Sequence, residues 1–265
     1  MKIYEILDSE TELSIGVLQY YERERSCVIE LRNYLDEWSA PLLFTGYVKR
    51  KIYTMPRDIS FLWVKERVIP SGRQNINEIL KNHRLPRYDE MKMLEISSGR
   101  CSQDSLYIKE LDSLPEFVKE RKKHNLLDCV MCEKNTVLCF FADNTVKKIA
   151  LEQIAESDGV DKVMKNNALF ESGEVGTDGY CLTFNHSIDI PAYELYKIEK
   201  SIPMCRSDFD NFIRKNILDT TESCHLLECT RQNIAYMIRK QMVSPVKAEV
   251  KGNLYLKGDI LKNKW

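Results

Sequence analysis

The chain has 265 residues, of which 43% are hydrophobic and 30% are charged, a balance typical of a soluble globular protein with two or three domains. Its ten glycines and eight prolines argue against long flexible linkers. The net charge of −1 does not by itself indicate a nucleic-acid partner, but residues 201–265 hold eleven Lys and Arg against seven Asp and Glu, whereas the preceding residues hold 28 against 33.

The start of the chain and its cysteines predict a reducing compartment. Residues 1–5 lack the apolar segment of a signal peptide, and the longest apolar runs, such as 137–142, are far shorter than a membrane span. The nine cysteines are an odd number and lie mostly within apolar runs. We therefore expect reduced thiols, a cytoplasmic location and no membrane contact.

Residues 1–120 are expected to form an N-terminal α+β domain. Weak alternation of apolar and polar residues predicts an antiparallel sheet with strands at 3–6, 15–20 and 27–31 and a charged hairpin loop at 22–25. Residues 61–64 are interpreted as a buried segment. Helices are predicted at 73–82 and 89–96, followed by a strand at 106–108. Pro115 and the basic run 121–123 predict a domain boundary.

Three features of this region carry a family likeness. They are Gly16-Val17-Leu18 in the sheet, the loop Ile69-Pro70-Ser71-Gly72, and two helices that end at Ser98-Gly99-Arg100-Cys101. On these residues the region resembles the small N-terminal subdomain of HipA-type toxin kinases. Nothing similar to the kinase body follows, so the resemblance implies no phosphotransferase activity.

Residues 125–200 are expected to form a small αβ domain. Strands are predicted at 129–132, 136–141 and 145–149, joined by turns in which Asp and Asn tolerate a positive φ. A helical stretch is predicted at 151–166. Further strands are expected at 180–184 and 188–191, with His186 in the hairpin turn between them.

The same region carries a second family likeness over about seventy residues. It rests on Phe141-Ala142-Asp143-Asn144-Thr145, on Phe170 with Val175, and on Ser187-Ile188-Asp189-Ile190-Pro191-Ala192 ending at Leu195-Tyr196. These residues resemble the bacterial family catalogued as domain of unknown function 2442, in which Asn144 is more often glycine. The resemblance implies a neighbouring helix-turn-helix and no catalytic residues.

No motif in the sequence indicates catalysis. Phosphate-binding glycine loops, the GxSxG elbow and HExxH are absent, and the four histidines are isolated from one another. We therefore predict no enzyme activity, no catalytic residue and no cofactor. Cys129-x-x-Cys132, with His124 and Cys139 nearby, leaves a zinc site as an alternative. The apolar residues around it favour a buried hairpin, so no metal is predicted.

Residues 203–265 are expected to form a helix-turn-helix domain with a basic hairpin. A first helix, with Phe209, Phe212, Ile213 and Ile217 at helical spacing, is predicted to support the other two. A helix at 221–227 would be capped by threonines, and Thr230 would cap a second helix at 231–241. The core between them is predicted to hold Leu226, Leu227, Ile234, Met237 and Ile238. Strands at 243–246 and 253–256 would form the hairpin.

The polar and basic residues left on the outside of this domain are the predicted DNA-binding residues. Arginine suits the O6/N7 edge of guanine and Asn or Gln the N6/N7 edge of adenine, whereas lysines suit phosphates. The predicted set is Thr230, Arg231, Gln232, Asn233, Tyr236, Arg239 and Lys240 on the second helix, with Lys247, Lys251, Asn253 and Lys257 on or after the hairpin.

Two segments of this domain, Cys229-Thr230-Arg231-Gln232-Asn233-Ile234 and Gly252-Asn253-Leu254-Tyr255-Leu256-Lys257, carry a third likeness. Over about fifty residues the domain resembles the winged helix-turn-helix domains of the excisionase and MerR-like group. The resemblance implies a double-stranded DNA partner and a role as a transcriptional regulator or mobile-element accessory factor. The helix from Arg231 would then read the major groove.

Several alternatives stay open. The helix-turn-helix could instead dock a protein through Tyr236, Met237 and Trp265, and the N-terminal domains could supply self-association or a protein partner. Arg73-Gln74-Asn75 repeats the tripeptide at 231–233, so it is either a second DNA-reading helix or a solvated helix start. An unrecognised enzyme is the third alternative.

Overall fold

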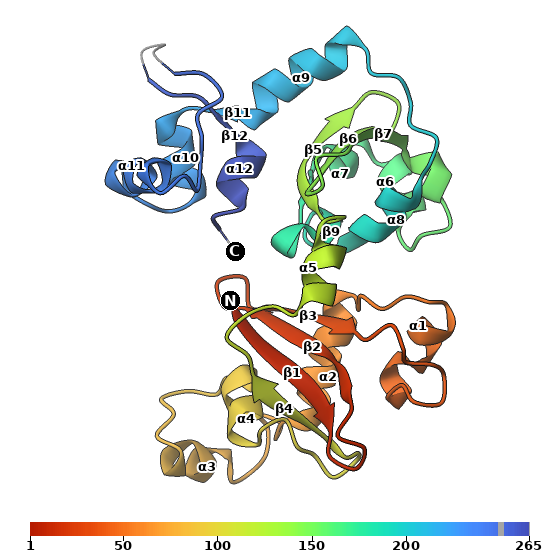
Figure 1. The fold of residues 1–265 in the computed structure, drawn as a ribbon, viewed down its shortest axis with the longest axis vertical. Coiled ribbons are helices and arrows are strands. Elements are labelled where there is room, and N and C mark those ends of the chain that lie inside the picture. The colour runs from red at the N-terminus through yellow and green to blue at the C-terminus, as the bar shows by residue number, and fades with distance from the viewer. Residues whose placement is uncertain (249–251, 265) are drawn as a thin grey trace. The chain divides into compact units, whose positions relative to one another are not determined.

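The computed structural model describes residues 1–248 and 252–264, and the chain divides into two compact units, Met1–Lys119 and Glu120–Trp265. Its fold is α+β, with several small antiparallel sheets and short helices (Figure 1). Among the described residues, no helix combines the length and the apolar character that a membrane crossing requires. The second unit contains both regions that the sequence analysis places in separate domains, 125–200 and 203–265.

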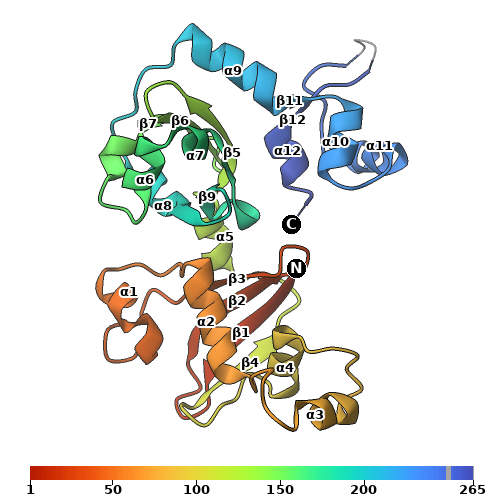
Figure 2. The same cartoon turned by 180° about the vertical axis from the view of Figure 1, so that it is seen from behind.

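Unit 1 is built on an antiparallel sheet with the strand order β3-β2-β1-β4. The strands are β1 (Lys2–Asp8), β2 (Ser14–Tyr21), β3 (Ser26–Leu31) and β4 (Leu106–Glu110), which confirms the three strands and the later strand predicted from the sequence. Helix α2 (Arg57–Arg67) lies across one face of this sheet (Figure 2). The backbone N–H of Ile29 in β3 donates to the Ser60 hydroxyl of α2 at 3.0 Å, which fixes the helix against the strand.

The other helices of unit 1 are short. They are η1 (Leu42–Phe44), α1 (Thr45–Lys49), α3 (Ile76–Asn82), α4 (Glu90–Ile96) and, at its end, α5 (Glu116–Lys122). Two predictions need correction. Only Trp63 and Val64 of the segment 61–64 are buried. The segment belongs to helix α2, in which successive side chains point in different directions around the axis, so Leu62 faces the solvent. Helix α3 begins at Ile76, so Arg73-Gln74-Asn75 precede it in a turn.

Unit 2 contains two three-stranded antiparallel sheets that share the central core. The first has the order β5-β6-β7, and the second β10-β9-β8. Their strands are β5 (Leu126–Cys132), β6 (Thr136–Phe141), β7 (Val146–Ala150), β8 (Gly173–Val175), β9 (Cys181–Phe184) and β10 (Ile188–Pro191). Asn144 has φ 70° and His186 has φ 53°, so the turns predicted at these residues are confirmed. A positive φ at Asn144 also explains why glycine suits that position.

The helix predicted at 151–166 is wrong as a continuous element. The segment forms η2 (Leu151–Ile154) and then α6 (Val160–Lys165), separated by Gly159, whose φ of 77° lies in the left-handed region. A side chain at Gly159 would also approach Ile188 to 2.8 Å. The remaining short helices of this region are α7 (Asn167–Glu171), η3 (Thr177–Gly179) and α8 (Ala192–Lys197).

Helix α9 (Arg206–Asn216) packs against the first sheet of unit 2, which corrects the prediction that it supports the helix-turn-helix. The Phe212 ring lies 4.8 Å from that of Phe140 in β6. The Lys148 Nζ of β7 lies 2.8 Å from an Asp208 carboxylate oxygen, and both side chains are buried. The reason is that Phe212 packs on the face of the sheet formed by Val130, Cys132, Leu138 and Phe140, whose other face is covered by the central core. Phe209 and Ile213, predicted to take part in this support, are about half exposed.

Candidate nucleic-acid interface

The helix that follows α9 is α10 (Thr220–Leu226). Its N-cap is Asp219 and not one of the threonines, which corrects the sequence prediction. The Asp219 carboxylate accepts from the Glu222 N–H at 2.8 Å, and the Glu222 carboxylate accepts from the Asp219 N–H at 2.8 Å. This reciprocal capping box satisfies two donors of the first turn, so Asp219 is a stronger cap here than a threonine hydroxyl.

A tight turn leads from α10 to α11 (Arg231–Arg239). Glu228 has φ 51° in this turn, and the Thr230 hydroxyl caps α11 by accepting from the Asn233 N–H at 3.4 Å. The predicted core is confirmed: buried residues Leu227 and Ile234 meet the partly buried side chains of Leu226, Met237 and Ile238. Val243, Tyr255 and Ile260, which the sequence analysis leaves out, complete this core.

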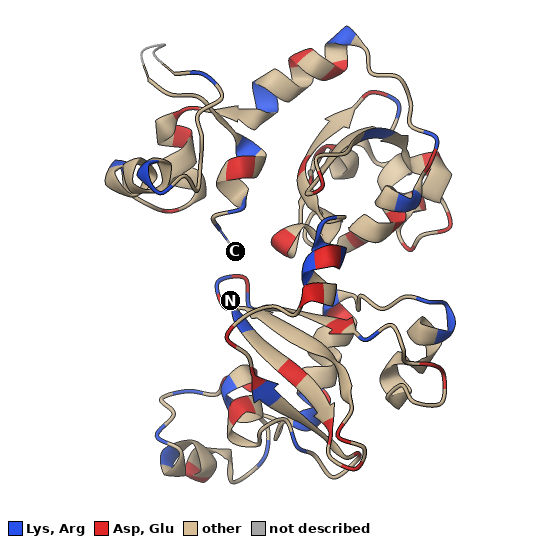
Figure 3. Ribbon diagram, in the orientation of Figure 1, with Lys and Arg blue, Asp and Glu red and all other residues tan. Residues whose placement is uncertain are grey.

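The outer face of α11 is exposed and basic. Its exposed residues are Arg231, Gln232, Asn233, Tyr236 and Arg239, with Thr230 before and Lys240 after the helix. Figure 3 shows the basic positions of α11, and its sequence has no carboxylate. Among the described residues, no carboxylate lies within ion-pair distance of Arg231, Arg239 or Lys240.

Two side chains of this face have local contacts that still leave their charge unneutralised. The Arg231 Nη2 donates to the Thr221 hydroxyl of α10 at 3.1 Å, which links the first turns of the two helices. The Lys240 Nζ lies 5.8 Å from the centre of the Tyr236 ring. A neutral hydroxyl and an aromatic ring are weak partners, so both cations are available to an external anion.

The predicted hairpin is smaller than expected. Residues 243–246 form no strand; one antiparallel bridge joins Lys247 to Leu254, with the Leu254 N–H donating to the Lys247 carbonyl at 2.9 Å. The next residues form β12 (Tyr255–Leu256), which pairs with β11 (Ile217–Leu218) at the end of α9. The sequence predicts that this strand pairs with residues 243–246, whereas in the structure it pairs with β11. The burial of Tyr255 in the core beside α10 and α11 holds the strand there.

The hairpin residues of the predicted site are placed unequally. Lys247 is exposed at the bridge, and Asn253 is half-buried. Lys251 lies outside the described residues. Lys257 is half-buried at the start of α12 (Lys257–Leu261), where its charge acts on the carboxylate of Asp128 in β5. The structure therefore brings Thr230, Arg231, Gln232, Asn233, Tyr236, Arg239 and Lys240 together on α11 and its two caps. Lys257 lies apart from them at the start of α12, where it acts electrostatically on Asp128.

Asp128 is a buried carboxylate that the sequence analysis misses. It accepts from the Asn216 side-chain amide of α9 and from the Gly258 N–H of α12, the latter at 3.1 Å. Burial raises the pKa of Asp128 above its usual value, and the Asn216 amide and the Lys257 charge oppose that rise. This carboxylate therefore joins the first sheet of unit 2 to α9 and α12, which precede and follow the α10–α11 pair.

The structure gives no support for the alternative zinc site. Cys129 lies opposite Cys139 in the β5–β6 pair, and both side chains belong to the apolar core. Burial in this core raises the pKa of Cys129 to about 12. Within residues 1–248 and 252–264, no group of three His, Cys, Asp or Glu side chains is arranged to hold a metal ion.

Comparison of the chain with models of known protein families, with curated proteins and with solved structures finds no match.

Proposed function

We propose that the protein binds double-stranded DNA through α11, as a transcriptional regulator or mobile-element accessory factor. The observation that carries the proposal is the exposed face of α11, on which three cations have no carboxylate partner within residues 1–248 and 252–264, and Arg231-Gln232-Asn233 occupy the N-terminal end. Helix-turn-helix proteins contact base edges with the N-terminal residues of their second helix. Arg239 and Lys240, at the other end of the helix, suit phosphate contacts.

The bridged segment around Lys247 and Leu254 would serve as the wing of a winged helix-turn-helix. Its support is the exposure of Lys247 on the segment that follows α11. Lysines contribute to affinity without reading sequence, because they replace condensed counterions on the phosphates. Replacing Lys247 by Ala is expected to lower affinity for all duplexes alike and to reduce the slope of log affinity against log salt by about one.

The direct test compares two matched double variants. Arg231→Ala with Asn233→Ala removes two base-reading side chains, and Arg73→Ala with Asn75→Ala removes the same two residue types from exposed positions before α3. We expect the α11 variant to lose at least about tenfold in affinity for its preferred fragment, since a bidentate base contact contributes about 1–3 kcal/mol. The matched variant should bind like the wild type.

Fragments of genomic DNA, including the region upstream of the protein's own coding sequence, are the ligands for fluorescence anisotropy at two salt concentrations. Retention of both affinity and salt dependence in the α11 variant contradicts the proposal. Equal losses in both variants indicate that the turn before α3 also contacts DNA, as the sequence alternative allows.

A protein partner is the second candidate function. Tyr236, Met242 and Val246 are each about half exposed around the end of α11, and aromatic and Met side chains are enriched in protein interfaces. Met237, suggested from the sequence as a contact, packs in the helix-turn-helix core instead. Capture of a partner that survives nuclease treatment and is lost in Tyr236→Ala would favour this candidate over DNA.

A further inference from the structure

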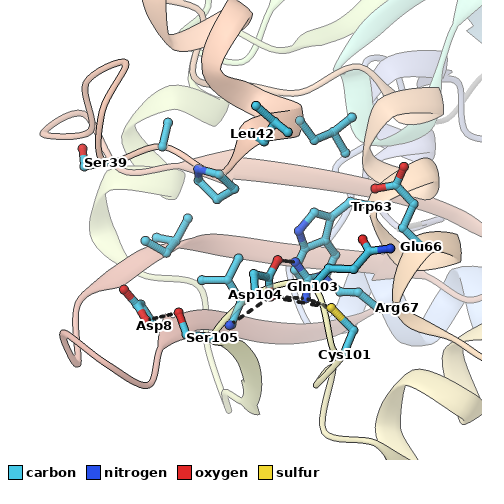
Figure 4. Close-up of a pocket in the computed structure, with 15 residues that line it drawn as sticks. Asp8, Ser39, Leu42, Trp63, Glu66, Arg67, Cys101, Gln103, Asp104 and Ser105 are labelled. Atoms are coloured by element: carbon cyan, nitrogen blue, oxygen red, sulfur yellow. Dashed lines mark hydrogen bonds and ion pairs between the residues drawn. The ribbon is translucent and has the colours of Figure 1, made fainter.

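Unit 1 contains a cavity that the DNA-binding proposal does not use. It has a volume of about 500 Å³ and lies between α2, the segment leading into η1, and the loop before β4. Figure 4 shows Trp63 between Leu42 on one side and Asp104 on the other. Pockets for small organic ligands measure about 300–1,000 Å³, so the volume suits such a molecule.

Two N–H donors, both on residues that line this cavity, have no acceptor in the part of the chain that the structure describes. The Trp63 Nε1 and the Arg67 Nε are shielded from solvent, and neither has a hydrogen-bond partner among the described residues. The two residues are one helical turn apart on α2, and the Arg67 guanidinium carbon lies 4.1 Å from the centre of the Trp63 ring. A buried donor without a partner costs about 1–3 kcal/mol, which a bound acceptor would recover in part.

The cavity has no surplus positive charge. The Arg67 Nη1 donates to an Asp104 carboxylate oxygen at 2.8 Å, and Nη2 contacts the other oxygen. Burial acts to raise the pKa of Asp104, but the hydrogen bonds from Arg67 and from the Leu106 N–H, together with the Arg67 charge, lower the pKa below its usual value. The Asp104 carboxylate therefore neutralises Arg67. Asp8 and Glu66 also line the cavity, and the described part of the chain offers neither of them an ion-pair partner.

The remaining lining is apolar on one side and carries the polar side chains of Ser39, Gln103 and Ser105 elsewhere. The apolar side includes the side chains of Ile15, Pro41, Leu42, Leu43 and Leu106. Leu42 is 93% exposed, so an apolar ligand beside it would remove hydrocarbon surface from water. The cavity thus combines two unused donors, an apolar wall and two carboxylates that would repel an anion.

We propose that this cavity binds a small, uncharged carbonyl compound with an apolar body. Its oxygen accepts from the Trp63 Nε1 and the Arg67 Nε, and its hydrocarbon part contacts Leu42 and its neighbours. Both donor atoms are shielded from solvent in this structure, so binding requires side chains of the wall to rearrange. Carboxylates and phosphates of similar size are excluded by Asp8 and Glu66. The proposal is independent of DNA binding.

The test uses neutral and anionic probes of matched shape on the full chain. The probes are benzamide against benzoate, and cyclohexanecarboxamide against cyclohexanecarboxylate. The three tryptophans, labelled at the indole nitrogen, give separate NMR signals, and Trp38→Phe and Trp265→Phe identify the signal of Trp63. We expect the amides to shift the Trp63 signal to saturation with a Kd on the order of millimolar, and the carboxylates to bind at least about tenfold more weakly.

A second variant tests the charge argument without touching the buried donors. Glu66→Gln, an exposed position, should raise benzoate affinity about threefold or more, whereas Glu78→Gln, exposed on α3 away from the cavity wall, should leave it unchanged. The proposal is overturned if neither amide moves the Trp63 signal, if the shift is confined to another tryptophan, or if carboxylates bind as tightly as amides.

Discussion

Two groups of charges in unit 2 differ in their partners. At the junction of the first sheet with α9, Lys148 is 11% exposed, and its partner Asp208 is 4% exposed. On α11, Arg231, Arg239 and Lys240 are exposed, and none is paired with a carboxylate of the described chain. The difference teaches that the junction charges are satisfied within the fold, whereas the α11 charges have no such internal role and would serve the DNA binding proposed above. Each prediction below tests that separation.

The largest effect is expected from Lys148→Met compared with Lys240→Met. Removing Lys148 leaves the buried Asp208 carboxylate without its cation, and breaking a buried pair costs about 3–5 kcal/mol. We expect a loss near the lower value, since the Cys205 N–H still donates to Asp208 at 2.7 Å. Urea unfolding at neutral pH measures the change in the free energy of unfolding.

Lys240→Met should change that free energy by less than about 0.5 kcal/mol, as expected for an exposed position. It should instead weaken duplex binding and its salt dependence. Equal losses of stability in the two variants would contradict the separation of folding charges from binding charges.

The next effect concerns how α12, which follows the α10–α11 pair, is attached to the sheet. A Cβ at Gly258 would lie 3.0 Å from the Leu127 carbonyl oxygen and 3.2 Å from the Asp128 Cβ, both part of the strand β5. Gly258→Ala should therefore push α12 away from β5 and cost about 1–3 kcal/mol, as overpacking does. Thermal and urea unfolding of the full chain measure it.

Gly46→Ala is the matched control, because a Cβ there meets nothing within 4 Å and Gly46 lies in helix α1. It should be neutral or stabilising by up to about 1 kcal/mol, since alanine favours a helix more than glycine does. If Gly258→Ala is as harmless as Gly46→Ala, α12 does not depend on close contact with β5.

The sequence predicts local elements well where periodicity and caps agree. Thr230 as a cap and Ile234 as a core residue follow from a pattern within ten residues, and the structure has both. The turn residues Asn144 and His186 are equally local, because a positive φ depends on residue type. These features need no knowledge of what packs where.

The errors concern contacts between segments far apart in the chain. No residue near Phe212 in the sequence indicates that α9 packs on the sheet and not on the α10–α11 pair. An apolar stripe shows that a helix is packed, but not which element it packs against. In the sequence, Asp128 directly precedes the predicted strand 129–132, a position that many exposed residues occupy. The groups that donate hydrogen bonds to its carboxylate belong to Asn216 and Gly258, far along the chain. The unpaired donor of Trp63 is likewise invisible before the tertiary structure places it.

The smallest effect is a pH dependence at Asp128. Burial raises its pKa in the folded state, so its contribution to stability is full below the unfolded-state pKa and is lost as pH rises through the folded-state pKa. The free energy of unfolding of the wild type minus that of Asp128→Asn should therefore fall with rising pH.

Asp143 provides a control of opposite sign. Burial acts to raise its pKa, but hydrogen bonds from the Tyr196 hydroxyl and the Thr145 N–H outweigh burial and lower the pKa. The free energy of unfolding of the wild type minus that of Asp143→Asn should rise with pH over the same range. Urea unfolding from about pH 3 to 8 measures both differences. If the two differences in unfolding free energy change with pH in the same direction, Asp128 is hydrated in solution. The junction between the sheet and α9 would then lack the buried carboxylate that distinguishes it from α11.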